Sequence, residues 1–265
     1  MNDAPTKGYE RDVGSHTTIR VIGHSNLKSI LSNPRNLLVG SYRETSDHVI
    51  IAWLYKTNIY KDFAYKTVLN FSQVYKDINF YIHTTEMMRS NNERFLNETG
   101  ITRNQARTWL TTGWHAMLLA IEICSDITVF GMVDDEYCTK NPNSTIPYHY
   151  YNNGGKVRLE CEYYMKSEHR LHGGHLFVTE KYIFGRWAQK YGIRFKYPGW
   201  KRKTYNNTFI DTPFMKLYRE KKGNLSTEGL AGFSDNETKT VYTVNSFVSE
   251  EETIRDNFMV IGRGR

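Results

Sequence analysis

The sequence has few cysteines and no long apolar segment. Its three cysteines, Cys124, Cys138 and Cys161, form no Cys-x-x-Cys pair. This spacing argues against a zinc site and allows at most one internal disulfide, with one thiol left over. No window approaches the roughly 18 apolar residues of a membrane span. The opening MNDAPTKGYE lacks the apolar core of a signal peptide, so the chain shows no route of its own into the secretory pathway.

Acidic residues are outnumbered by basic ones. The 265 residues carry 35 Lys and Arg against 28 Asp and Glu, which gives a net charge of +7. This excess favours an anionic ligand, although many secreted domains are mildly basic for no specific reason. The basic runs at 201–203 and 219–222 are too short for a nucleic-acid surface, so we expect no nucleic-acid partner. Apolar residues make up 39% of the chain, enough to bury a core in one large α/β domain or two small ones.

Sequons for N-glycosylation are more frequent than the composition predicts by chance. They begin at Asn70, Asn97, Asn143, Asn206, Asn224 and Asn236. This frequency favours a glycosylated lumenal protein.

The hydrophobic pattern alternates between strands and helices. Strands are predicted at Thr17–His24, from Asn36 (NLLVGSY), at Asp47–Tyr55, at Ile78–Thr85, in ITVFGM and in IRFKYP. Helices are predicted at Glu86–Glu98, after the TTG turn at Thr111–Gly113, at Phe177–Tyr191, and in SEEETIRDNF from Ser249. The residues from Asp134 to Tyr164 are predicted to form a long loop. A helix followed by a short buried strand is typical of a doubly wound α/β sheet.

Two features are candidates for binding a phosphate group. Free backbone N–H groups at the TTG turn would form an anion site, although an ordinary capped helix is the better explanation for three residues alone. In PYHYY, His149 is able to donate to a phosphate oxygen or to move a proton. The alternative is a histidine packed among aromatic side chains.

Two further features are candidates for chemistry. His175 follows two glycines at the start of a predicted helix, where the helix-end potential would keep it neutral, as a general base must be. The glycines would leave room for a ligand, or His175 is simply exposed on a flexible loop. The acids at Asp134–Glu136 could bind a divalent metal, but a solvated acidic loop explains them better.

The order of these features resembles that of the animal sialyltransferases of glycosyltransferase family 29, and within it the GalNAc α2,6-sialyltransferases that act on sialylated glycans. Residues 1–21 resemble the second half of the large sialylmotif, and Thr111–Met132 the small motif. His149–Asn152 resembles motif III, and His175–Glu180 the very small motif.

The resemblance implies a single Rossmann-like domain of the sialyltransferase type, a GT-A variant with a mostly parallel sheet flanked by helices. It implies inverting transfer from CMP-sialic acid to a hydroxyl of a sialylated glycan on a glycoprotein or glycolipid, without a metal or other cofactor. His175 would be the general base, and His149 would donate to the departing phosphate. The nucleotide would be held by Asn2, Thr111, Thr112 and Gly113, and Glu180 would brace the helix.

The chain also departs from the family pattern. It begins at the Met-Asn of the large motif, so we expect an N-terminally truncated catalytic domain at 1–200. The cysteine that normally pairs with Cys124 lies in the missing half, which leaves Cys124 unpaired and a Cys138–Cys161 bridge possible. Motif III usually ends in an acid, where this chain has Asn152. Residues 201–265 match nothing in the family and form a divergent, poorly ordered tail in this interpretation.

The family's location is the Golgi lumen, reached through a membrane anchor that this chain lacks. The rival interpretation is a non-catalytic binding protein that keeps at most a partial CMP or glycan site. The missing half motif favours that rival, and the presence of His149 and His175 disfavours it.

Overall fold

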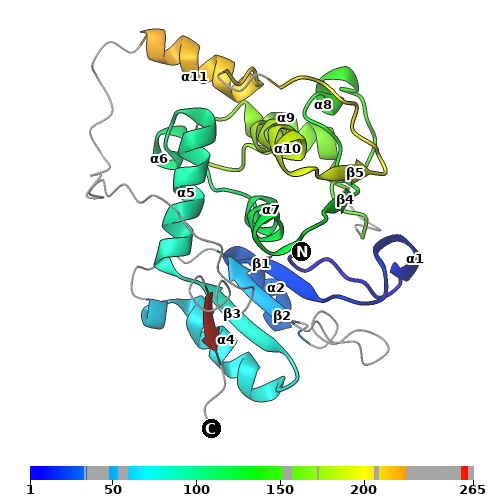
Figure 1. The fold of residues 1–265 in the computed structure, drawn as a ribbon, viewed down its shortest axis with the longest axis vertical. Coiled ribbons are helices and arrows are strands. Elements are labelled where there is room, and N and C mark those ends of the chain that lie inside the picture. Colours follow the sequence, from blue (N-terminus) through cyan, green and yellow to red (C-terminus); the bar gives the residue numbers. More distant parts are fainter. Residues whose placement is uncertain are drawn as a thin grey trace.

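The computed structural model describes residues 1–32, 34, 48–52, 59–151, 157–171, 173–205, 209–224 and 258–261. One half of the molecule is a sheet with helices on it, and the other half is mainly helical (Figure 1). The short helices and turns are α1 (Glu10–Val13), η1 (His24–Asn26), η2 (Ile59–Lys61), α6 (Arg103–Ala106) and α8 (Tyr137–Lys140). Among the described residues, no helix is long and apolar enough to cross a membrane.

The main sheet has the strand order β1-β2-β3-β6. Strands β1 (Ile19–Gly23), β2 (His48–Ala52) and β3 (Asn79–His83) are parallel, and β6 (Phe258–Ile261) pairs antiparallel with β3. Strands β1 and β2 are buried along nearly their whole length, because helices and loops cover both faces. The expected α/β fold with a parallel sheet flanked by helices is therefore confirmed.

The strands predicted at Thr17–His24 and Ile78–Thr85 are confirmed, and the one at Asp47–Tyr55 is confirmed over β2. The strand predicted from Asn36 lies outside the described residues. So does most of the helix predicted from Ser249, whose last residue begins β6.

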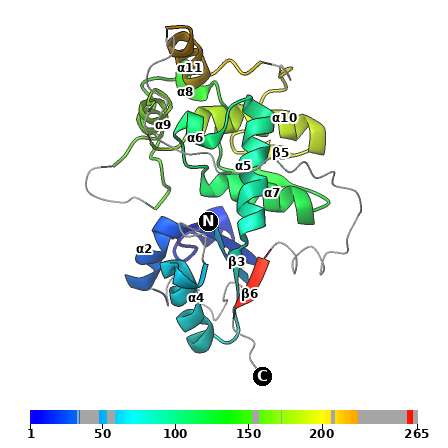
Figure 2. The same ribbon diagram turned by 90° about the vertical axis from the view of Figure 1, so that its left-hand side faces the viewer.

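Two helices, α2 (Leu27–Ser32) and α4 (Phe63–Val74), cover one face of this sheet (Figure 2). They pack on it through an apolar cluster that includes Ile22, Leu27, Ile30, Val49, Val68, Phe80 and Ile82. Asp62 begins α4, and its carboxylate accepts a hydrogen bond from the Ala64 N–H at 2.8 Å. The same carboxylate lies 2.8 Å from His24 Nε2, which joins α4 to the end of β1.

The other half is built around helices α5 (Thr85–Thr99), α7 (Thr112–Ile123) and α10 (Phe177–Tyr191). The ring centroids of Trp114 on α7 and Trp187 on α10 are 4.8 Å apart. Every residue of α10 from Phe177 to Trp187 is buried. All three helices agree with their predicted ranges to within a residue or two. Helices α7 and α10 show apolar periodicity, and α5 and α10 end at the glycines Gly100 and Gly192.

The strand predicted in ITVFGM exists as β4 (Thr128–Phe130), but it does not join the main sheet. It pairs in parallel with β5 (Arg194–Lys196) in a separate two-stranded sheet. The prediction of a buried strand in one doubly wound sheet is wrong here. With only one neighbour, β4 leaves Phe130 60% exposed.

The predicted loop from Asp134 to Tyr164 contains α8 and the start of α9 (Glu160–Glu168), so a continuous loop is wrong there. A disulfide between Cys138 and Cys161 ties these two helices together. Cys124 is an exposed free thiol, as expected.

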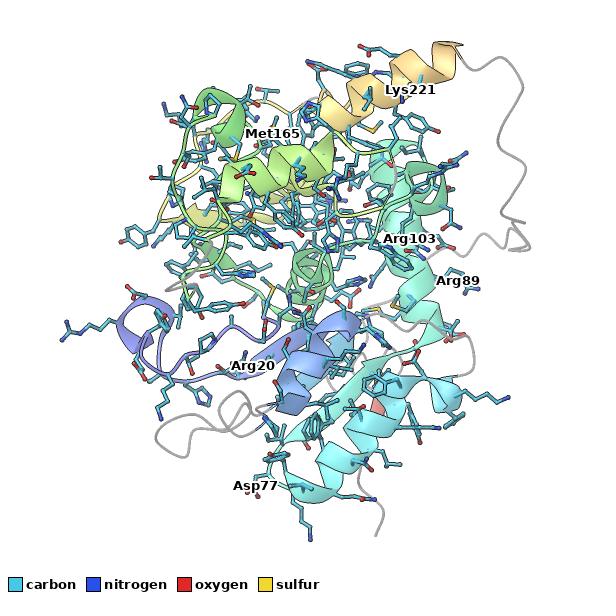
Figure 3. The ribbon with its side chains drawn as sticks, turned by 180° about the vertical axis from the view of Figure 1, so that it is seen from behind. Arg20, Asp77, Arg89, Arg103, Met165 and Lys221 are labelled. Atoms are coloured by element: carbon cyan, nitrogen blue, oxygen red, sulfur yellow. A yellow bond between two sulfur atoms is a disulfide. The ribbon has the colours of Figure 1, made fainter. Side chains whose placement is uncertain are left out.

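Residues beyond 200 also contribute to the core. Ile210, Phe214 and Met215 belong to the large apolar cluster of the helical half, and Phe214 begins the buried face of α11 (Pro213–Asn224). In Figure 3, Lys221 on α11 and Asp77 lie at opposite ends of the molecule. The domain division at residue 200 stays a prediction.

Candidate active site

A cavity of about 590 Å³ opens where the end of β1 meets the starts of α7 and α10. All six residues singled out from the sequence line it: Asn2, Thr111, Thr112, Gly113, His149 and His175. Its volume lies within the usual range for a small-molecule site. The structure therefore brings together residues that are up to 173 positions apart, from Asn2 to His175.

Asn2 forms the corner of the cavity next to β1. Its side-chain oxygen accepts hydrogen bonds from the Gly23 N–H at 2.8 Å and from the Thr112 hydroxyl at 3.1 Å. Gly23 has to be a glycine, because a Cβ there would lie 2.7 Å from the Thr112 hydroxyl oxygen. Among the described residues, the side-chain N–H groups of Asn2 have no acceptor, so they remain available to a ligand.

Arg20 holds the segment that carries Asn2. This buried side chain on β1 is labelled in Figure 3. It donates hydrogen bonds to the carbonyl oxygens of Asn2 at 3.0 Å and Ala4 at 2.9 Å. This role was not predictable from the sequence, since an arginine within an apolar run is usually exposed.

The turn that opens α7 is fixed by Glu180. Thr111 caps the helix through its hydroxyl, which accepts from the Trp114 N–H at 3.0 Å. The carboxylate of Glu180 accepts from the Thr111 N–H at 2.9 Å and from the Thr111 hydroxyl. Burial raises the pKa of Glu180 to about 8. These contacts leave the N–H groups of Thr112 and Gly113 without acceptors in the described part of the chain, as at any helix start, so an anion can bind there.

His175 is half-buried and its ring is held in one orientation. Its Nδ1 donates to the Trp109 carbonyl at 2.5 Å, and its ring packs edge-on against Phe177. Since Nδ1 carries the proton, Nε2 presents a lone pair. Burial lowers the pKa of His175, partly opposed by the Trp109 carbonyl. The imidazole is therefore neutral at pH 7, and burial is the main cause. The predicted contribution of the helix-end potential stays a prediction.

The two glycines before His175 adopt a backbone conformation that favours glycine, and Gly174 lines the cavity, as the predicted room for a ligand requires. Both have positive φ, +65° at Gly173 and +99° at Gly174, and a Cβ on Gly174 would lie 2.9 Å from Ser167 Oγ. The Gly174 carbonyl accepts from the Trp109 N–H at 3.0 Å, and the Gly173 N–H donates to the Arg107 carbonyl at 2.9 Å. They form a tight, hydrogen-bonded turn that fixes His175.

His149 is both packed among aromatic rings and part of the cavity wall. It stacks on Tyr151 with centroids 4.8 Å apart, and its ring lies 4.2 Å from that of Tyr148. Burial lowers its pKa, Arg158 lowers it further, and Asp3 opposes the shift. A neutral His149 still has one ring N–H with which to donate a hydrogen bond.

The acidic run at Asp134–Glu136 is used for ion pairs. Lys203 Nζ lies 2.7 Å from Asp135 and 3.0 Å from Glu136. Across the described ranges no group of three His, Cys, Asp or Glu residues is arranged to hold a metal ion. The expected independence from metal stays a prediction.

Sequence reasoning missed two cationic residues that line the cavity, Arg158 and Lys181. Arg158 is exposed, with its guanidinium 4.3 Å from the ring centroid of Tyr163. Lys181 directly follows Glu180 and is buried. Neither belongs to a pattern that distinguishes it from the other basic residues of the chain.

A cavity at the end of parallel strands, beside a helix start and an oriented histidine, is typical of α/β enzymes that bind phosphorylated ligands. Comparison of the sequence with known protein families identifies the family. The model of glycosyltransferase family 29 (sialyltransferase) matches residues 1–184, and the chain belongs to this family. No solved structure gives a significant match.

The curated relatives are named as members of one group of sialyltransferases. Human alpha-N-acetylgalactosaminide alpha-2,6-sialyltransferase 3 is 38% identical over 203 residues, which cover 76% of this chain and 64% of the relative. Human alpha-N-acetyl-neuraminyl-2,3-beta-galactosyl-1,3-N-acetyl-galactosaminide alpha-2,6-sialyltransferase is 36% identical over 205 residues, covering 76% and 66%. The chain thus spans less than two thirds of the length of these relatives.

Proposed function

We propose that this chain binds CMP-sialic acid and transfers the sialyl residue to a hydroxyl of an already sialylated glycan, in α2,6 linkage to GalNAc. The observation that carries the proposal is the convergence of residues from all four sialylmotifs on one cavity. The linkage and the acceptor are those in the names of the relatives.

In the proposed reaction, Nε2 of His175 takes the proton of the acceptor hydroxyl while the oxygen attacks the anomeric carbon of the sialyl residue. The bond between that carbon and the phosphate oxygen breaks, and CMP departs. Attack from the face opposite the phosphate inverts the configuration. The Nδ1 contact of His175 with Trp109 supports this role, because it leaves Nε2 as the basic nitrogen.

The departing phosphate gains negative charge, and hydrogen-bond donors stabilise it. His149 and the free N–H groups of Thr112 and Gly113 are the donors that we assign to it, and the side-chain N–H groups of Asn2 are assigned to the nucleoside. This assignment needs no metal or other cofactor, so activity is expected to persist in EDTA.

We place the protein in the Golgi lumen. The disulfide between Cys138 and Cys161 supports an oxidising compartment. Three sequon asparagines, Asn70, Asn97 and Asn143, are exposed, as glycosylation requires.

The test is a transfer assay in EDTA with CMP-sialic acid and an α2,3-sialylated Gal-β1,3-GalNAc acceptor, read by mass spectrometry. Disialylated product is expected from the wild type. His175→Ala should lower turnover by about 10²–10⁴, while calorimetry should show CMP binding within about threefold of wild type.

Wild-type turnover in His175→Ala would remove the histidine from the reaction. CMP binding without transfer by the wild type would favour the rival, a binding protein without catalysis. Neither binding nor transfer would contradict the proposed function.

A further inference from the structure

Lys181 is a buried cation for which the described part of the chain supplies no hydrogen-bond acceptor. Its side chain is 5% exposed, and its Nζ has no acceptor among the described residues. The nearest carboxylate oxygen, on Glu160, is 4.0 Å away, which is too far for a hydrogen bond. An ammonium group in this position has lost its hydration without full replacement, and such groups are uncommon unless something pairs with them.

The surroundings of Lys181 compensate its charge only in part. Its Nζ lies 4.0 Å from the ring centroid of Tyr164, a favourable cation–π contact. The carboxylate of Glu160 also hydrogen bonds with the Tyr164 hydroxyl. Burial lowers the pKa of Lys181 to about 8, opposed by Glu160, Asp134 and Asp135. At neutral pH the group therefore keeps most of its positive charge.

Lys181 also belongs to the same wall of the cavity as His149. Both residues line the cavity, together with Tyr148 and Tyr164. The ring of Tyr148 lies 4.2 Å from that of His149 and 5.7 Å from that of Tyr164, the ring over which Lys181 sits. One set of contacting aromatic rings thus carries both the histidine assigned to the phosphate and the ammonium group of Lys181.

We propose that Lys181 binds an oxyanion of the nucleotide-sugar donor, either its phosphate or the carboxylate of its sialyl residue. This inference rests on the proposed function, and it adds a donor-binding residue outside the four sialylmotifs. An anionic oxygen supplies the acceptor that the ammonium lacks, and a charge-assisted hydrogen bond forms where water is already excluded.

The variants are Lys181→Met, which keeps the aliphatic stem, and the double variant Glu160→Gln/Lys181→Met, which removes both buried charges together. Circular dichroism shows whether Lys181→Met folds. If it does not fold, the double variant is measured in its place. Lys190→Met is the matched control, because Lys190 is an exposed lysine on the same helix. Calorimetry with the full chain measures the affinity for cytidine and CMP, and initial rates give KM for CMP-sialic acid and for the acceptor.

A loss of about tenfold or more in CMP affinity, with cytidine unchanged, supports the phosphate as the group bound. An unchanged CMP affinity with a similar rise in KM for CMP-sialic acid supports the carboxylate. Lys190→Met should match the wild type in both measurements.

Wild-type values for both CMP and CMP-sialic acid in the Lys181 variants would overturn the inference while leaving the proposed function intact. An equal loss of cytidine affinity, or a rise in KM for the acceptor alone, would also overturn it. If the wild type binds neither CMP nor CMP-sialic acid, the proposed function fails, and the inference fails with it.

Discussion

Substitutions of Glu180 test whether it only holds the turn at Thr111 in place or also takes part in the transfer reaction. Its carboxyl group is buried and receives two hydrogen bonds from Thr111, the residue that caps α7. Glu180→Gln keeps an oxygen for the Thr111 N–H and places an amide against the Thr111 hydroxyl. Glu180→Ala removes both contacts. If Glu180 braces the turn, the glutamine variant should bind CMP within about threefold of wild type, whereas the alanine variant should bind it at least tenfold more weakly.

The magnitudes follow from the contacts and from the pKa. The alanine variant leaves the Thr111 N–H and hydroxyl without their acceptor, at a cost of about 2–4 kcal/mol in the free energy of unfolding. The pKa of Glu180 rises from 4.5 to about 8 on folding, so the folded chain holds the proton more tightly than the unfolded chain. Its stabilising effect is therefore present below pH 4.5 and is lost as the pH rises through 8. The upper limit of that loss is several kcal/mol.

Glu168 contributes to the same trend. Burial raises its pKa to about 7, so it too destabilises the fold as the pH rises. Urea unfolding of wild type, Glu180→Gln and Glu180→Ala between pH 5 and pH 9 measures the effect, with CMP affinity measured in parallel. The glutamine variant should lose less stability than wild type across this range, and Glu168 should account for part of the slope that remains.

Two results would refute this reasoning. Equal destabilisation by glutamine and alanine at pH 6 would mean that the brace needs an ionised carboxylate. A stable glutamine variant with normal CMP affinity but a hundredfold loss of turnover would mean that Glu180 takes part in the reaction.

Three further substitutions test other contacts. His149→Ala should lower kcat by about 10²–10³ because a donor to the departing phosphate is lost; an unchanged kcat in initial-rate assays would remove it from the site. Cys138→Ser/Cys161→Ser should lower the free energy of unfolding by about 2–4 kcal/mol in urea titrations, and an unchanged value would mean that α8 and α9 are held by packing alone. Gly174→Ala should cost about 1–3 kcal/mol through its positive φ, whereas Gly199→Ala, at a glycine without positive φ, serves as the control; equal effects would argue against strain at Gly174.

The sequence predicted the elements whose signals are local. Helix α10 begins and ends where its apolar periodicity and Gly192 placed it, and β1 and β3 follow their β-branched runs. Pairing between distant segments was not predictable in this way. The apolar residues of β4 would suit a place in the main sheet as well as they suit its pairing with β5. Which of the two forms depends on contacts with residues distant in the sequence, and the local pattern does not show them. The pairing of β6 with β3 is a contact of the same kind.

In the site, the sequence predicted which residues are present, whereas their surroundings are visible only in the structure. The four motifs located six cavity residues, but the burial that lowers the pKa of His175 is visible only in the structure. Gly173 and Gly174 are visible in the sequence, yet only the backbone angles show that they form a hydrogen-bonded turn beside the cavity. Lys181 is one of many basic residues until α9 packs against α10 and places Glu160 and Tyr164 around it. Its burial without a hydrogen-bond acceptor among the described residues, and not its identity as a lysine, is what points to a bound anion.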